Sequence, residues 1–451
     1  MSPDRIQIDV ARGRPDTASG SVNRVGRTIT HQEDLLHRQL NPFQRRGETR
    51  VGAERETTSS TSEDPSGLDD GGAVDECQQW VLHRCRGDTS DVNGTAVPPT
   101  PPGEDWERAI NFARRHRIDM LLFASIDRDT IGPASVREAV ERMETNTKRQ
   151  NLQMAAALID IVDVLRDNDI PVITYKGPVV ASRAYGDISL RRFVDLDVLV
   201  APADRRQAIE TLEAAGYERR KRYKHLSEVV LEHPETGTVI DLHTDAVPDD
   251  IPVSLPFGEL YERRTRVDIG GQAVPALSLE DAVMVHAVHG SKHCWYRGEW
   301  LLAVTALIRQ SKDLGALFGH LRANGCERMA LCALIITHRL FGADYPESMY
   351  DVVERESSEW ESATATAAQF TQWITRPEWV TDDRSHLEGL RAQLRLCPSV
   401  RTKVRFFLDT VTKPQEADRE FVSLPDIVSP LYRIVRPVRL LYRYRESLNR
   451  G

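Results

Sequence analysis

Residues 193–200 read FVDLDVLV, a run in which two aspartates alternate with apolar side chains. Alternate residues of a β-strand point to the same face, so Asp195 and Asp197 are predicted to lie side by side while Leu196 and Val198 enter the core. Two neighbouring carboxylates repel each other unless a cation lies between them. Mg²⁺ prefers such hard oxygen ligands, so this stretch predicts a metal-binding strand.

A second strand with the same alternation is predicted at residues 239–243, which read VIDLH. Asp241 could complete a carboxylate triad with Asp195 and Asp197. His243 lies two residues beyond Asp241 and therefore on the same face of the strand. It is expected either to contact phosphate or the acceptor, or to hydrogen-bond across the sheet.

A Lys-Gly pair, Lys176-Gly177, lies between a predicted strand at residues 171–175 and a predicted helix at residues 179–185. A residue without a Cβ lets a phosphate approach the backbone N–H groups at a helix N-terminus, and the lysine adds positive charge. Arg191 is spaced to approach the mouth of the aspartate strand. It could neutralise triphosphate charge, or it could form a surface salt bridge.

The neighbouring segments predict more of the same sheet. A helix at residues 202–215 is followed by a hairpin of residues 225–232 and 238–243 around a Pro-Glu-Thr-Gly turn. The predicted order is therefore strand, helix, strand, helix, hairpin. Beyond about residue 277 the apolar spacing is that of helices.

Together these motifs resemble a poorly characterised bacterial and archaeal nucleotidyltransferase family of the polymerase-β superfamily. The resemblance is carried by residues 173–178 (ITYKGP), 185–187 (YGD), 190–200 (LRRFVDLDVLV), 215–217 (AGY) and 240–243 (IDLH). It implies an α+β fold, with a polymerase-β-like nucleotidyltransferase core of mixed sheet, flanked by N-terminal helices and a helical C-terminal domain. It also implies that Asp195, Asp197 and Asp241 are the metal carboxylates.

The activity implied by this resemblance is transfer of an NMP from an NTP to a hydroxyl acceptor, with two Mg²⁺ ions and release of pyrophosphate. The acceptor could be a small molecule, a protein or RNA. Lys176, Gly177, Arg191 and His243 are the candidate nucleotide-binding residues. Two alternatives stay open: transfer of the γ-phosphoryl group on the same fold, and a degenerate nucleotide-binding or scaffold protein.

The chain departs from the family pattern at three places. The Gly-Ser phosphate turn of the superfamily is replaced by the Lys176-Gly177 pair and a proline, and Arg192 and Val194 stand where proline and glycine are expected. The phosphate site is therefore less well defined by the sequence than the metal site. Separately, Ala303 stands where many relatives are expected to have an aspartate, so a helper acid is expected to be missing.

Three histidines, His286, His289 and His293, recur at spacings of three and four and so share one face of a predicted helix. They could belong to a zinc site. No acid is obviously placed to complete such a site, and a helix face packed on the catalytic cleft is the alternative.

Composition and spacing predict five segments. They are a disordered N-terminal segment (1–72), a short isolated helix with a proline-rich linker (73–103), an N-terminal helical region (104–165), the nucleotidyltransferase core (166–265) and a helical C-terminal domain with a basic tail (266–451).

The net charge of −9 excludes a globally cationic nucleic-acid-binding surface. In residues 391–451, Lys and Arg outnumber acids, which suits a peripheral anionic partner such as a membrane surface or RNA, or the solvated side of a docked helix.

The cellular location is expected to be the cytoplasm. The six cysteines form no CxxC pair, and the start of the chain lacks a basic-then-apolar signal pattern. No uncharged apolar run reaches the roughly 18 to 20 residues that span a bilayer, so no transmembrane helix is predicted.

Overall fold

The computed structural model describes residues 74–86, 97–220, 228–247, 251, 253, 255–343, 352, 357–375, 383–414 and 416–448. The predicted disordered segment, residues 1–72, lies outside the described residues. So do residues 225–227, the start of the predicted hairpin.

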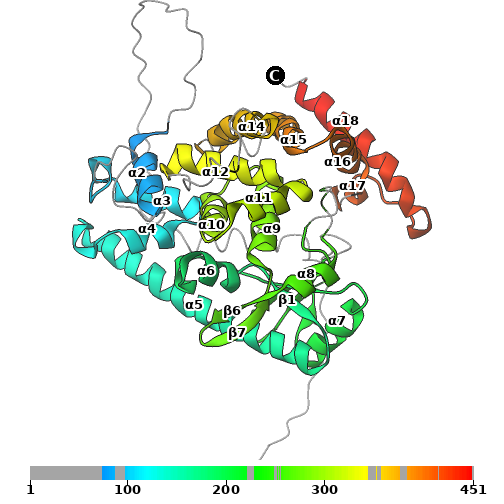
Figure 1. Cartoon of the computed structure of the whole chain (residues 1–451), viewed down its shortest axis with the longest axis horizontal. Helices are drawn as coiled ribbons and strands as arrows, with labels where there is room; N and C mark the ends of the chain where they lie inside the picture. The colour runs from blue at the N-terminus through cyan, green and yellow to red at the C-terminus, as the bar shows by residue number, and fades with distance from the viewer. Residues whose placement is uncertain are drawn as a thin grey trace, which may run out of the picture. The chain divides into compact units, whose positions relative to one another are not determined.

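Seven strands form one mixed sheet in the described part of the chain, in the spatial order β3-β4-β5-β2-β1-β7-β6. Figure 1 labels three of them, β1, β6 and β7. β2 runs parallel to β5 and β1 runs parallel to β7, while the other neighbours are antiparallel. The predicted α+β class with a mixed sheet is therefore confirmed. The strands are β1 (Val172–Thr174), β2 (Leu196–Val200), β3 (Glu218–Arg219), β4 (Glu228–Glu232), β5 (Val239–His243), β6 (Thr265–Ile269) and β7 (Gln272–Ala276).

The helices beside the sheet follow the apolar spacing of the sequence. The long helix α5 (Ala134–Asp167) and the shorter α7 (Arg205–Ala214) share one core with the strands. The helix α6 (Pro178–Tyr185) begins directly after Gly177, with proline at its first position. The buried residues of α5 that join this core are Met154, Ala155, Leu158, Ile161, Val162 and Leu165.

The sheet extends further along the chain than the sequence pattern predicted. β6 and β7 pair around Gly270 and Gly271, which both have positive φ, and β7 joins β1 through Thr174 and Ala276. A two-residue turn with positive φ at both positions suits a hairpin and favours glycine. The predicted boundary between residues 265 and 266 therefore lies inside β6.

A second hydrophobic core is formed mainly by helices that precede the first strand and follow the last strand in the sequence. It contains buried residues of the N-terminal helices and of the helices after residue 277. The remaining α-helices of the described residues are α2 (Glu76–Cys85), α3 (Trp106–Arg115), α4 (Asp119–Ser125), α8 (Phe257–Arg263), α9 (Leu279–Lys292), α10 (Gly298–Arg309), α11 (Leu314–Ala323), α12 (Glu327–Phe341), α14 (Ser358–Thr375), α15 (Asp383–Leu396), α16 (Val400–Thr412), α17 (Glu416–Phe421) and α18 (Tyr432–Leu448).

The helix near residue 80 is not isolated, contrary to the expectation from the sequence. Trp80 of α2 meets Trp106 of α3 edge to face at 5.8 Å between ring centroids, and Val81 and Leu82 are fully buried in the second core. The proline-rich linker determines only local stiffness, so it could not reveal this distant packing. Among the described residues, no helix is long and apolar enough to cross a bilayer.

Candidate active site

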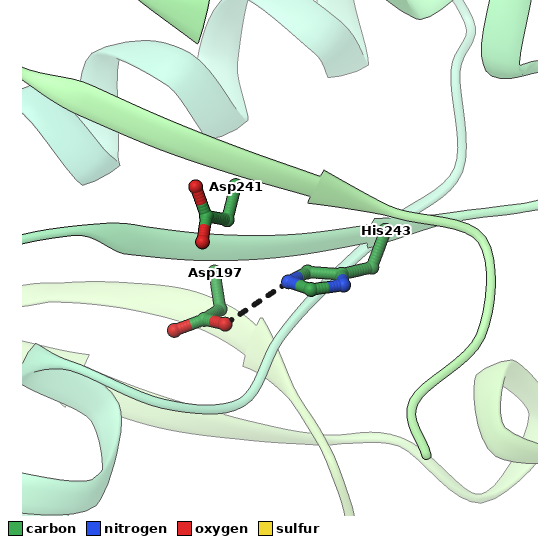
Figure 2. A group of neighbouring side chains, drawn as sticks. All are labelled: Asp197, Asp241 and His243. Carbon is green, nitrogen blue, oxygen red and sulfur yellow. Dashed lines mark hydrogen bonds and ion pairs between the residues drawn. The ribbon is translucent and has the colours of Figure 1, made fainter. Parts of the chain in front are cut away.

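Two buried aspartates meet on the central strands of the sheet. Asp197 of β2 and Asp241 of β5 are partners in the parallel ladder, with exposed fractions of 6% and 8%. His243 lies two residues beyond Asp241 on the same face (Figure 2). One ligand atom from each of Asp197, Asp241 and His243 lies within 4.8 Å of the others. The register of β2 and β5 therefore builds a compact group of oxygen and nitrogen donors.

Oδ1 of Asp197 is contacted by the side-chain nitrogens of two residues. The Nζ of Lys176 lies 2.6 Å from Asp197 Oδ1, and the Nε2 of His243 lies 3.1 Å from the same oxygen. Burial opposes the charge on Asp197, but Lys176 and His243 outweigh it and hold the pKa of the carboxyl well below its usual range. Burial also lowers the pKa of the Lys176 ammonium, but Asp197 raises it more, so the pKa ends above its usual value. Asp197 and Lys176 are therefore both charged at neutral pH.

Gly177 has a backbone conformation that suits only glycine. Its φ is +54° and its ψ is −126°, at the start of α6. A Cβ at this position would lie 3.4 Å from the backbone oxygen of Asp195. The Lys-Gly pair therefore brings the turn after β1 close to the backbone that enters β2.

Asp195 directly precedes β2 and is half-buried, so the strand begins at Leu196, three residues later than the predicted start at residue 193. Burial, followed by the negative charge of Asp197, raises the pKa of the Asp195 carboxyl. Asp195 is not part of the three-residue group that Asp197 forms with Asp241 and His243. The structure thus brings two of the three predicted carboxylates together and places the third at the entrance to the strand.

Arg191 belongs to a buried charge cluster rather than to a surface salt bridge. Its Nη2 lies 3.7 Å from Oε2 of Glu299, and the exposed side-chain fractions are 12% and 2%. Arg117 and Arg297 approach the other oxygen of Glu299 at 3.8 and 4.0 Å. Three arginines around one carboxylate leave a net positive charge beside Asp195, and Arg117 and Arg191 offset part of the rise in its pKa that burial and Asp197 cause. The sequence could not reveal Glu299, because its only local signal is an acid at the start of a helix.

The histidine-rich face belongs to α9 and packs toward the aspartate strands. His286 is buried, and burial, followed by Arg191, lowers its pKa to about 3. Its Nε2–H donates to the carbonyl oxygen of Tyr175, at 3.0 Å. His289 and His293 instead pack on the ring of Trp300, each with ring centroids 5.2 Å away. Within the described ranges the three histidines form no metal-ligand group. Their contacts with Tyr175 and Trp300 are those of a packed helix face.

Comparison with known proteins gives one family match. Residues 102–342 match the model of a family described as "Uncharacterised nucleotidyltransferase". No curated protein matches the chain.

Solved structures with detectable similarity include ANT(2")-Ia in complex with adenylyl-2"-tobramycin, at 12% identity and a TM-score of 0.31, covering 38% of this chain and 96% of that one. A solution structure of ANT(2'')-Ia has 12% identity and a TM-score of 0.29, covering 37% and 90%. An antigenic nucleotidyltransferase-like protein from Paracoccidioides brasiliensis has 16% identity and a TM-score of 0.25, covering 40% and 92%.

Proposed function

Because the chain belongs to the family of uncharacterised nucleotidyltransferases, which matches more than half of its length, we propose that it transfers an NMP from an NTP to a hydroxyl acceptor with the help of Mg²⁺. The observation that supports this proposal best is the pairing of Asp197 with Asp241 in the ladder of β2 and β5, with His243 beside them.

The donor atoms of this group fit Mg²⁺. Carboxylate oxygens are the ligands that Mg²⁺ prefers, and both aspartates are buried in a place where water cannot fully solvate their charges. Asp197 and Asp241 would hold one ion, and Asp197 with Asp195 would hold a second. When bound, Mg²⁺ would neutralise phosphate charge and lower the pKa of an attached hydroxyl.

The basic residues around the aspartates would bind the triphosphate. Lys176, now 2.6 Å from Asp197, would turn its ammonium to a phosphate oxygen, and the turn at Gly177 would let the phosphate approach the backbone. Arg191 would add positive charge from the cluster around Glu299. These residues would hold the α-phosphate in line with the attacking hydroxyl.

In the transfer step, the acceptor oxygen forms a bond to the α-phosphorus while the bond from that phosphorus to the bridging oxygen breaks. Asp241 would take the proton of the acceptor hydroxyl, and the electron pair of the broken bond leaves with pyrophosphate. Charge on the leaving group would be neutralised by Lys176 and Arg191.

The test is incubation of the purified protein with Mg²⁺, cell extract and each NTP labelled at either the α- or the γ-phosphate. We expect the α label to move to an acceptor while unlabelled pyrophosphate is released from the NTP, with Asp197→Asn as the inactive control. Transfer of the γ label would show phosphoryl transfer instead. Absence of transfer with every NTP in the wild type would favour a degenerate nucleotide-binding protein.

A further inference from the structure

The exposed apolar side chains of this protein are concentrated in one segment. Among the described residues, the large apolar side chains that are strongly exposed lie between positions 400 and 442, apart from Leu152 and Val194. This segment contains α16, α17 and α18, at the C-terminal end of the chain (Figure 1). Large apolar side chains left exposed together in one segment usually mark an interaction site.

On α16 the exposed apolar residues form a stripe with helical spacing. Val400, Val404, Phe407 and Leu408 are separated by four, three and one positions, so they share one face of the helix. Phe406, on another side of the helix, is buried and anchors α16 to the core. The stripe is therefore the outer face of a docked helix.

The last helix, α18, also has an exposed apolar face, and two of its arginines point to the interior. Arg439 Nε lies 2.6 Å from Oδ1 of the fully buried Asp418, and Arg436 Nε donates to the carbonyl oxygen of Thr410 at 2.7 Å. The sequence allowed arginines on a solvated face, but these two arginines face the interior. The outer face of this region carries Leu431, just before α18, and Ile434, Val438, Leu441 and Tyr442.

Cations flank the apolar stripe of α16 on both sides. Successive residues of an α-helix are 100° apart around its axis, so Arg401 lies at one edge of the stripe and Lys403 at the other. Arg401 and Arg405 are exposed and Lys403 is half-buried, while the one acid in the sequence of α16, Asp409, lies 3.7 Å from Arg405. An apolar face bordered by cations on both sides is complementary to a surface that is apolar inside and anionic at its rim.

We propose that α16 and α18 dock this protein on the surface of an anionic lipid bilayer. The stripe of α16 and the outer face of α18 would enter the boundary between headgroups and acyl chains, and Arg401, Lys403 and Arg433 would contact lipid phosphates. The helices would lie along the membrane surface, since no described helix is long and apolar enough to cross it. This docking is independent of the proposed nucleotidyl transfer, because none of its residues belongs to the aspartate site.

The test is co-sedimentation of the full chain with vesicles of phosphatidylcholine mixed with phosphatidylglycerol, compared with vesicles of phosphatidylcholine alone. We expect binding to the anionic vesicles only, and weaker binding at high salt. The double variant Phe407→Ser/Leu408→Ser should bind at least about tenfold more weakly. Arg401→Glu/Lys403→Glu should weaken binding by about fivefold or more for each charge removed.

Leu152→Ser is the matched control, because Leu152 is an apolar residue on α5 that is at least as exposed as Phe407 and Leu408 and lies outside the proposed docking surface. It should bind vesicles as the wild type does, and circular dichroism of all variants should be unchanged, since none of the substituted side chains is buried in the core. Equal binding by the wild type and the Phe407→Ser/Leu408→Ser variant would overturn the proposal. So would absence of binding to both vesicles, or self-association of the wild type that this double variant abolishes, since a second copy would then be the partner.

Discussion

Asp197 and Asp241 are register partners in the parallel ladder of β2 and β5, and both side chains are almost fully buried. Two carboxylates placed this way repel each other. Lys176, 2.6 Å from Asp197, and His243, 3.1 Å from the same oxygen, stabilise the negative charge of Asp197. The site therefore already contains a cation in the place where the proposed reaction needs positive charge.

Replacing either aspartate should stop turnover. We expect Asp197→Asn and Asp241→Asn each to lower kcat by at least about a hundredfold, because an amide is a poorer ligand for Mg²⁺ than a carboxylate. Asp195→Asn should have the same direction of effect. The measurement is release of pyrophosphate from NTP in the presence of the acceptor fraction.

The matched control for these variants is Glu235→Gln, in the turn between β4 and β5. It removes one carboxylate from the same hairpin as Asp241, but its side chain is exposed. We expect turnover to be unchanged. Wild-type turnover in Asp197→Asn or Asp241→Asn would exclude the proposed metal site.

Removing the ammonium next to Asp197 should change two affinities in opposite directions. Lys176→Met should bind free Mg²⁺ about tenfold more tightly, because no cation then neutralises Asp197, and should bind NTP more weakly, because a phosphate contact is lost. The variant should also lose about 1–3 kcal/mol of unfolding free energy, since a buried carboxylate loses its partner. Calorimetric titration measures both affinities.

Lys148→Met on the exposed side of α5 is the control for the loss of one lysine. It should change neither affinity. A parallel fall in the Mg²⁺ and NTP affinities of Lys176→Met would show that the lysine supports the site structurally and does not compete with the metal.

Adding a methyl group at the Lys-Gly turn should strain the site. Gly177→Ala places a Cβ in a backbone conformation that costs an L-residue about 1–3 kcal/mol and brings it to 3.4 Å from the backbone oxygen of Asp195. We expect lower thermal stability and lower turnover. Gly319→Ala in α11 is the control, because no atom lies within 4 Å of its added Cβ, and it should be neutral or stabilising by up to about 1 kcal/mol. Equal melting temperatures for the two variants would argue against strain at Gly177.

Two buried histidines should make the fold sensitive to acid. Burial lowers the pKa of His116 and of His286 to about 3, whereas in the unfolded chain each takes up a proton near pH 6.5. Between these values the unfolded state binds more protons, so the free energy of unfolding falls as the pH falls, by about 1.4 kcal/mol per pH unit for each histidine. His116→Gln should reduce this slope by that amount.

The slope is measured by urea unfolding at several pH values in this window. His116 packs on Phe112, with ring centroids 4.5 Å apart, so the variant should also be less stable at neutral pH. Only the change in slope tests the titration. An unchanged slope would mean that His116 is protonated in the folded protein at the same pH as in the unfolded chain.

Much of the aspartate site could be predicted from the sequence, because its signals are local. The alternation in FVDLDVLV and VIDLH predicted two strands with acids on one face, and β2 and β5 occupy those stretches. Proline after Gly177 predicted the start of α6. Such patterns depend only on the period of the backbone and on the φ values that glycine and proline allow.

Non-local pairing decided the rest. Only the register of β2 and β5 places Asp241 opposite Asp197, and only the folded chain shows that Lys176 and His243 share one oxygen of Asp197. The partners of α2, the pairing of β7 with β1 and the inward turn of Arg439 toward Asp418 were likewise absent from the sequence pattern. A sequence determines which face of an element is apolar or charged, whereas the partner of that face depends on packing between segments far apart in the chain.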